Sequence, residues 1–121
     1  MHVKRHKYGA KRTTVDGIAF ASQKEARRYQ ELKLLERAGE IHGLTLQPGF
    51  PLTVSAVADM RELPTKIGDY RADFIYCACR RGAKCDKTRL VVEDVKGFKT
   101  PLYRWKKKHV EAQYGITIHE V

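Results

Sequence analysis

Long apolar runs are absent from this 121-residue sequence, and cysteine is rare in it. No stretch approaches the roughly 18 apolar residues of a membrane-spanning helix, and no apolar core follows the charged start MHVKRHKYGAKR, as a signal peptide would require. The three cysteines, Cys77, Cys79 and Cys85, are an odd number and make no disulfide framework, so we expect reduced thiols. These absences predict a soluble protein of the cytoplasm.

Acidic residues are also in the minority. The chain has 24 Lys and Arg against 14 Asp and Glu, a formal charge of +10, and this excess favours a polyanionic partner, nucleic acid before an anionic membrane surface. Residues 1–12 are rich in Lys, Arg and His without apolar periodicity. They predict a flexible basic arm, ending in Lys11 and Arg12, that either contacts phosphates or only raises solubility. Residues 13–121 have the length of one domain.

The local signals predict an α/β fold. VDGIAF is typical of a tight hairpin, and a helix is expected over residues 22–38, with Ser22 as N-cap and Gly39 after its end. LTLQPGFPLTVSAV indicates two short strands or one sharply bent strand. The remaining predictions are a polar connection at MRELPTKIGD, strands at YRADFIYCAC and TRLVVEDVKG joined by an exposed loop, a helix over residues 100–114, and a final strand at ITIHEV.

Charged residues within the apolar patterns are the candidates for chemistry. On the first helix Glu25 falls in the same sector as Tyr29 and Leu32, so its carboxylate points into the apolar face. It either completes a capping box with Ser22 or is buried beside a positively charged partner, because an unpaired buried charge is too costly.

Asp94 and Lys96 lie two apart in a predicted strand and therefore share one face, roughly 7 Å apart, while Glu93 takes the other face. If the two strand-like runs pair as a hairpin, Asp73 lies across from Asp94. Facing carboxylates repel each other, and a divalent cation such as Mg²⁺ or Mn²⁺ would relieve that repulsion. The alternative is an ordinary ion pair between Asp94 and Lys96 at a strand edge.

The segments RAD, at Asp73, and DVK, at Asp94, resemble the signature of the PD-(D/E)xK nuclease superfamily, although Ala72 stands where that motif has Pro. DGIAFASQKEARRY, ADFIY, VVEDVKGFKT and YRWKKKH look more closely like a family of small phage and prophage proteins assigned to that superfamily. The resemblance covers about residues 7–121. It implies a restriction-endonuclease-like core of order α-β-β-β-α-β, with a mixed central sheet flanked by helices.

By this resemblance the protein is a phage-encoded, Mg²⁺-dependent DNA endonuclease of a bacterial host's cytoplasm, with Mn²⁺ as an alternative ion. Asp73, Asp94 and the main-chain carbonyl of Val95 would bind the metal, and Glu25 would contribute to the site. Lys96 would orient or deprotonate the attacking water and stabilise charge on the phosphate. Glu93 is interpreted as an outward neighbour.

The second predicted helix supplies cations and an apolar face. Lys99 precedes it, and Arg104, Lys107 and Lys108 share one side of it, as a backbone contact for DNA or as an ordinary solvated face. Leu102, Trp105 and Val110 are expected to pack on the sheet.

The C-x-C-x₅-C pattern lacks paired C-x₂-C knuckles, so a structural Zn²⁺ site at Cys77, Cys79 and Cys85 is not expected; it would need a fourth ligand such as His109 or His119. His42 is interpreted as structural.

Three functions are compatible with the sequence. They are a DNA endonuclease, with branched or Holliday-junction DNA as a candidate substrate, a non-catalytic nucleic-acid binder, and a basic RNA-binding protein. Cutting both strands would require a homodimer, for which the exposed Leu34 is an interface candidate.

Overall fold

The computed structural model describes residues 11–58, 63–80 and 82–121. Its helices are α1 (Gln23–Arg37) and α2 (Pro101–Tyr114), with a short 3₁₀ turn, η2 (Lys87–Arg89). Its strands are β1 (Thr13–Val15), β2 (Ile18–Phe20), β3 (His42–Leu46), β4 (Gly49–Val54), β5 (Thr65–Arg71), β6 (Phe74–Cys77), β7 (Leu90–Asp94) and β8 (Ile118–Glu120). Of the predicted basic arm, residues 1–10 lie outside the described residues.

The helix and turn signals act as the sequence predicts. Asp16 and Gly17 both have positive φ, 52° and 74°, in the tight β1–β2 turn, the conformation that an Asp-Gly pair tolerates best. The Ser22 side chain accepts a hydrogen bond from the Glu25 backbone N–H at 3.1 Å and so begins α1. Thr100 caps α2 in the same way, and Gly115, with φ of 64°, ends it.

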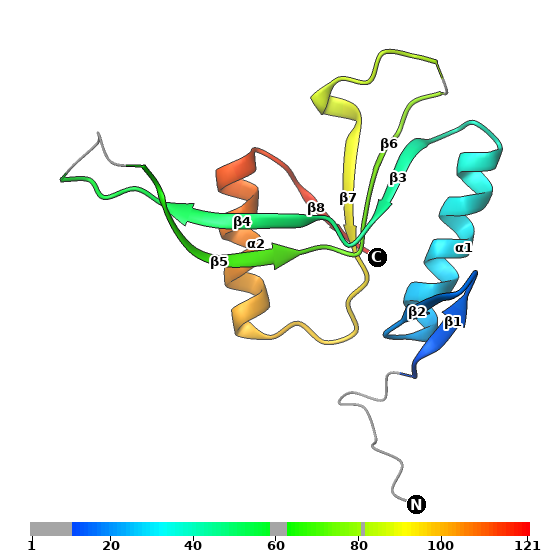
Figure 1. The fold of residues 1–121 in the computed structure, drawn as a ribbon, viewed down its shortest axis with the longest axis horizontal. Helices are drawn as coiled ribbons and strands as arrows, with labels where there is room; N and C mark the ends of the chain where they lie inside the picture. The colour runs from blue at the N-terminus through cyan, green and yellow to red at the C-terminus, as the bar shows by residue number, and fades with distance from the viewer. Residues whose placement is uncertain (1–10, 59–62, 81) are drawn as a thin grey trace, which may run out of the picture.

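The central sheet has the strand order β3-β6-β7-β8. β3, β6 and β7 pair antiparallel, and β8 joins β7 in parallel after the α2 crossover. Tyr29 and Leu32 of α1 pack with Phe74 and Tyr76 on one face of this sheet. Val110 of α2 belongs to a second core cluster on the opposite face, so α1 and α2 cover different faces, as Figure 1 shows.

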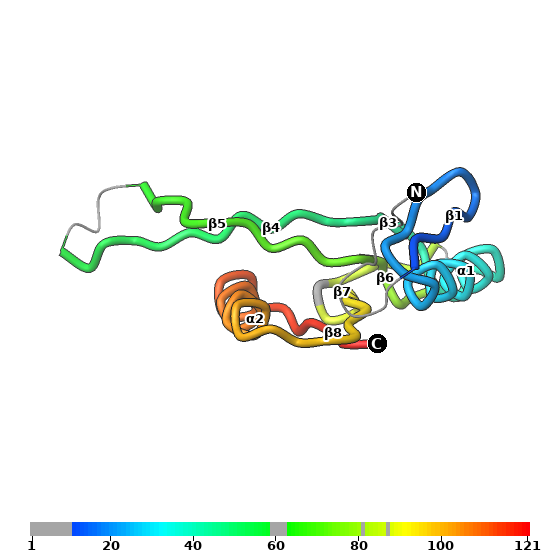
Figure 2. Tube along the Cα trace, turned by 90° about the horizontal axis from the view of Figure 1, so that it is seen from below, coloured from blue at the N-terminus to red at the C-terminus, as the bar shows by residue number. Residues whose placement is uncertain are grey.

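A β4–β5 hairpin arm extends β3 and β6 beyond the sheet (Figure 2). The two ribbons join at a bend where Gln47, with φ of 51°, donates its N–H to the Asp73 carbonyl at 2.8 Å. α2 packs beneath the arm, where Gln113 and Tyr114 hydrogen-bond to the Pro51 carbonyl. The prediction of a polar connection at MRELPTKIGD was therefore wrong over Thr65–Asp69, because pairing with β4 holds this polar segment as a strand.

The residues that the structure describes thus form a mixed α/β fold with several sheets and two helices. Within the described residues, neither helix is long and apolar enough to cross a membrane.

Candidate active site

The ends of β6 and β7 bring the two predicted aspartates together. β6 and β7 pair as an antiparallel hairpin that ends at the pair Phe74↔Glu93. Asp73 comes directly before β6, Asp94 is the last residue of β7, and their side chains interact. The Asp73 N–H donates to the Glu93 carbonyl at 3.1 Å, and its Oδ2 accepts from the Val95 N–H at 2.7 Å. Asp73 is therefore fixed by main-chain contacts on both sides.

Asp94 is almost completely buried, at 1% exposure. Its Oδ2 accepts a hydrogen bond from the Tyr70 hydroxyl of β5. Lys96 Nζ lies 3.3 Å from its Oδ1, yet this oxygen has no hydrogen bond within the described part of the chain. Lys96 also stacks over the Tyr103 ring, with Nζ 4.6 Å from the centroid. Tyr70 thus holds one oxygen of Asp94 by a hydrogen bond, while the other has only the ion pair with Lys96.

Glu25 reaches this site from the first turn of α1. Only 7% of it is exposed, and its carboxylate accepts from the Ala21 backbone N–H and interacts electrostatically with Asp94, Asp73 and Lys96. Burial, followed by repulsion from Asp94, raises the pKa of Glu25. Ser22 caps the helix through the Glu25 N–H, while the Glu25 side chain is buried in the acidic cluster, where Lys96 exerts only a weaker electrostatic effect on it.

Three carboxylates, those of Glu25, Asp73 and Asp94, thus meet a single ammonium, that of Lys96. Burial, and then the contact with Asp94, raises the pKa of Asp73 well above its ordinary value, since its charge would face two other carboxylates. Metal-free, the cluster must bind protons to relieve this repulsion. A hard divalent cation fits the same need, because the donors are all oxygens and Asp94 Oδ1 is a buried acceptor without a hydrogen bond.

The cationic residues of α2 lie beside this cluster. Lys99, Arg104, Lys107 and Lys108 line a shallow concave surface with Tyr103, Glu111 and Glu120, here called the cationic surface. The Glu120 carboxylate forms ion pairs with Lys107 at 2.7 Å and with Lys99 at 3.1 Å. These contacts, of which the one with Lys107 has the larger effect, lower the pKa of Glu120 to about 2. Arg104 and Lys108 form no ion pair with a described residue, so they are the cations available to another molecule.

Tyr103 connects the two regions, because its ring lies under Lys96 and also lines the cationic surface. Lys11 and Arg12, the other predicted DNA contacts, are exposed directly ahead of β1. They share no contact with the acidic cluster among the residues that the structure covers.

Glu93 does not face outward as predicted. It is buried at 2% exposure on the α1 face of the sheet. Arg28 Nε and Nη2 donate to its two oxygens at 2.7 and 2.8 Å, and the Tyr76 hydroxyl donates as well. Burial alone would raise the pKa of Glu93, but these hydrogen bonds hold it below its ordinary value. The prediction that Glu93 lies on the opposite face of the strand from Asp94 was correct. The prediction that it points outward was wrong, because its partner on α1, Arg28, was missed.

The apolar side of α2 also differs from its prediction. Val110 is buried, but Leu102 and Trp105 are 59% and 73% exposed, beside Ile67 of the arm. Tyr103 takes the inward place instead, and its seven-residue spacing from Val110, two helical turns, is the signal that would have identified it.

His109 and His119 are not the partners of the cysteines. His109 Nε2 lies 3.0 Å from the Thr53 carbonyl, and His119 stands in β8 beside Glu93. The histidine that joins Cys77, Cys79 and Cys85 is His42.

A family model described as "Protein of unknown function (DUF1064)" matches residues 5–119. The chain belongs to this family. The DUF1064 match includes every residue of the acidic cluster and of the cationic surface except Glu120. No curated protein matches the chain, and neither does any solved structure.

Proposed function

We propose that this chain is a Mg²⁺- or Mn²⁺-dependent DNA endonuclease with the restriction-endonuclease-like core of the PD-(D/E)xK superfamily. One observation carries the proposal. Glu25 of α1, Asp73 of the bend and Asp94 at the end of β7 are distant in sequence and meet in one cluster with Lys96, which follows β7. Burial, with repulsion from Asp94, raises the pKa of Glu25 and Asp73, and buried acids shifted in this way concentrate at functional sites.

Asp73, Asp94, Glu25 and the Val95 carbonyl would hold the metal ion. When bound, the ion would acidify a water molecule and neutralise charge on the phosphate. Tyr70 would keep Asp94 in one rotamer through its hydroxyl. Lys96, positioned by Asp94 and the Tyr103 ring, would orient the attacking water and donate to the phosphate oxygens in the one-step hydrolysis of the phosphodiester.

The cationic surface would hold the DNA backbone next to these groups. Arg104 and Lys108 line this surface and form no ion pair with a described acid. Their positive charge would therefore be free to bind phosphate groups. Among the described residues no dedicated base-reading module accompanies the cluster, which favours selection by DNA structure, such as a branch or Holliday junction. A homodimer is expected when both strands are cut, because so small a chain offers one site. A phage gene product acting in a bacterial cytoplasm is what the resemblance to the PD-(D/E)xK phage and prophage proteins implies.

The second candidate function is non-catalytic nucleic-acid binding. It is favoured by the 3.3 Å contact between Lys96 and Asp94, which a purely structural ion pair would also show. In that case the cationic surface would bind nucleic acid and the acids would only be neutralised by protons and Lys96.

Substitution of Asp94 by Asn separates the two functions. Supercoiled plasmid, linear duplex, branched DNA and RNA are each incubated with Mg²⁺, Mn²⁺ or EDTA. We expect the wild-type chain to cut DNA only with metal, and Asp94→Asn to lose cleavage while retaining or tightening DNA binding. Asp69→Asn is the matched control, because Asp69 is 62% exposed by side chain and pairs only with Lys66 among the described residues.

Cleavage that survives Asp94→Asn would show that the acidic cluster is not the active site. Absence of cleavage on every DNA, with metal-independent binding to DNA or RNA, would instead support the binding function.

A further inference from the structure

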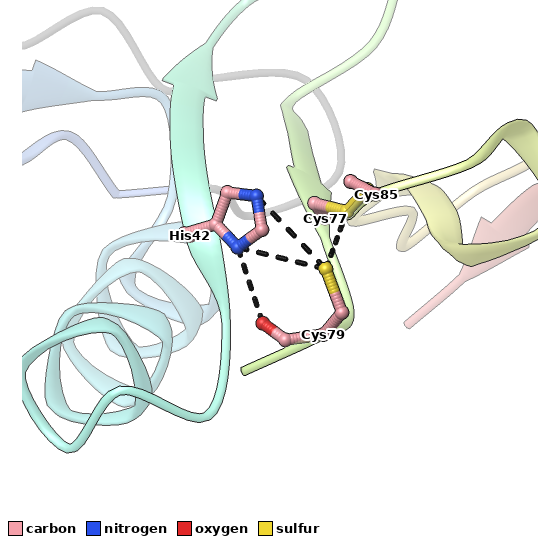
Figure 3. A group of neighbouring side chains, drawn as sticks. All are labelled: His42, Cys77, Cys79 and Cys85. Carbon is pink, nitrogen blue, oxygen red and sulfur yellow. Dashed lines mark hydrogen bonds between the residues drawn. A yellow bond between two sulfur atoms is a disulfide. The ribbon is translucent and has the colours of Figure 1, made fainter. Parts of the chain in front are cut away.

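A second cluster of metal-binding side chains lies at the opposite end of β6 from Asp73. His42 begins β3, Cys77 ends β6, Cys79 follows two residues later, and Cys85 comes from the β6–β7 loop (Figure 3). One ligand atom from each residue lies within 4.8 Å of all the others. Cys77 and Cys79 are 6% and 3% exposed, so two of the cysteine side chains are held inside the fold.

The spacing of these atoms suits tetrahedral zinc. With Zn–S near 2.3 Å and Zn–N near 2.0 Å, neighbouring ligand atoms in a tetrahedron are about 3.5–3.8 Å apart. Cys79 Sγ lies 3.6 Å from His42 Nδ1 and 3.9 Å from Nε2, and 3.0 Å from Cys77 Sγ. Small side-chain adjustments would bring all four atoms to coordination distance.

The surroundings of His42 prepare one ring nitrogen for a metal. Nδ1 lies 3.2 Å from the Cys79 carbonyl oxygen. A proton on Nδ1 is donated to this carbonyl, which leaves the lone pair of Nε2 for coordination. Metal-bound histidines usually carry such a hydrogen bond on the other nitrogen, because it fixes the tautomer and the ring orientation.

Cys77 and Cys85 form a disulfide, with their Cα atoms 6.4 Å apart. The expectation of three reduced thiols was therefore wrong for this pair, because the β6–β7 loop folds back and brings Cys85 to the end of β6. The bond uses two of the four residues and gives no role to the buried Cys79 thiol or to the imidazole that contacts it. A dithiol reductant would convert the disulfide to two thiols and become a disulfide itself. The three reduced thiols would then lose three protons on binding Zn²⁺.

We propose that His42, Cys77, Cys79 and Cys85 form a structural Zn²⁺ site in the reduced protein. Four protein ligands fill a tetrahedral shell and leave no position for substrate, so the role is structural. The ion would link the start of β3 to the end of β6 and to the loop before β7. Cys77 is four residues along the strand from Asp73, roughly 13 Å, so the site is separate from the acidic cluster.

The test is elemental analysis of the untagged full-length chain, purified in a thiol reductant and dialysed against metal-free buffer. We expect one Zn²⁺ per chain in the wild type, and loss of most of it in Cys79→Ser and His42→Gln. His109→Gln is the matched control, since His109 is a partly buried histidine outside the cluster, and it should retain the metal. Removal of the metal by a strong chelator should lower the Tm of the wild type and of His109→Gln.

Co²⁺ added to the reduced, metal-free wild type keeps the test decisive if a variant fails to fold. Tetrahedral thiolate ligation predicts strong visible ligand-field bands and a sulfur-to-cobalt charge-transfer band, both abolished by an equivalent of Zn²⁺. Reduced wild-type protein without zinc and without these bands, or zinc that remains in both cluster variants, would overturn the proposal. A loss of zinc from Asp94→Asn would do so too, because it would place the metal at the acidic cluster.

Discussion

The guanidinium of Arg28 binds both oxygens of Glu93, at 2.7 and 2.8 Å, across the interface between α1 and β7. Glu93 is almost completely enclosed, whereas a quarter of the Arg28 side chain is exposed. The pair fixes α1 to the sheet one residue before Asp94, and α1 carries Glu25. The distance between the acids of the cluster therefore depends on an ion pair on the other face of the sheet.

Glu93→Gln should destabilise the protein by about 1–3 kcal/mol, because it removes the buried carboxylate that Arg28 binds through Nε and Nη2 and leaves only the exposed Glu31 as its ion-pair partner. The wild-type pKa of Glu93 is lowered from 4.5, so its contribution to stability is present above pH 4.5 and is lost as the pH falls through the lowered value. Urea unfolding at pH 7 and at acid pH measures this: the difference between variant and wild type should shrink at acid pH. An equal difference at both pH values would contradict it.

Asp73→Asn should stabilise the metal-free protein by about 1 kcal/mol at pH 8, because it removes a charge from a site of mutual repulsion. The raised pKa of Asp73 means that the folded chain holds a proton that the unfolded chain releases above pH 3.8. Wild-type stability in EDTA should therefore fall as the pH rises from 3.8 towards the raised pKa, and this fall should be smaller in the variant. Thermal unfolding from about pH 5 to pH 8 tests it, with Asp69→Asn as the control that keeps the wild-type slope.

Tyr70→Phe should weaken cleavage about tenfold or more while leaving the fold intact, because Asp94 loses the hydroxyl that fixes one of its oxygens. A higher metal concentration for half-maximal cleavage would identify the defect as metal positioning. Tyr114→Phe is the matched control, since the Tyr114 hydroxyl binds the Pro51 carbonyl of the arm. Equal loss in both variants would mean that the effect is general destabilisation.

Arg104→Ala and Lys108→Ala should each weaken DNA binding on all sequences alike. Each should also reduce the salt dependence of log K by about one unit for every phosphate that the variant no longer neutralises. Fluorescence anisotropy over a series of salt concentrations measures the slope. Lys33→Ala is the control, because Lys33 pairs with Glu36 on α1. A slope unchanged in both α2 variants would exclude the cationic surface as the DNA-binding face.

Trp105 is the single tryptophan of the chain and is 73% exposed. Its emission should be that of a water-exposed indole and should be quenched by acrylamide before unfolding. Trp105→Phe should change the free energy of unfolding by less than about 0.5 kcal/mol. A blue-shifted, protected emission would mean that another molecule, such as a second copy, covers this side of α2.

Local signals predicted the elements of this fold well, since caps and turns act within a few residues. Ser22 and Thr100 cap the starts of α1 and α2, and Gly115 ends α2, as the sequence predicted. The closeness of Asp73 and Asp94 followed from the hairpin, because β6 and β7 are neighbours in both sequence and space. The inward direction of Glu25 followed from helical periodicity.

What the sequence did not reveal depends on contacts between distant segments. Arg28 and Glu93 are 65 residues apart, and no sequence pattern near Glu93 indicates that its carboxylate binds an arginine. The β4–β5 arm has polar residues at strand positions because α2 covers only one of its sides, so its composition resembles a loop. His42 is 37 residues from Cys79, and only the β3–β6 pairing brings it to the cysteines.

The bend at Gln47 and Asp73 separates the β3–β6 ribbon of the central sheet from the β4–β5 arm, and the length of the arm can change independently of the sheet. The acidic residues lie on α1 and at the ends of β6 and β7, while β4 and β5 run away from the central sheet (Figure 1). Side chains alternate between the two faces of a strand. Adding or removing two residues on each strand of the arm would therefore change its length, keep each side chain on its own face, and preserve the pairing near Asp73. The length of the β4–β5 arm can therefore change without moving the acidic cluster.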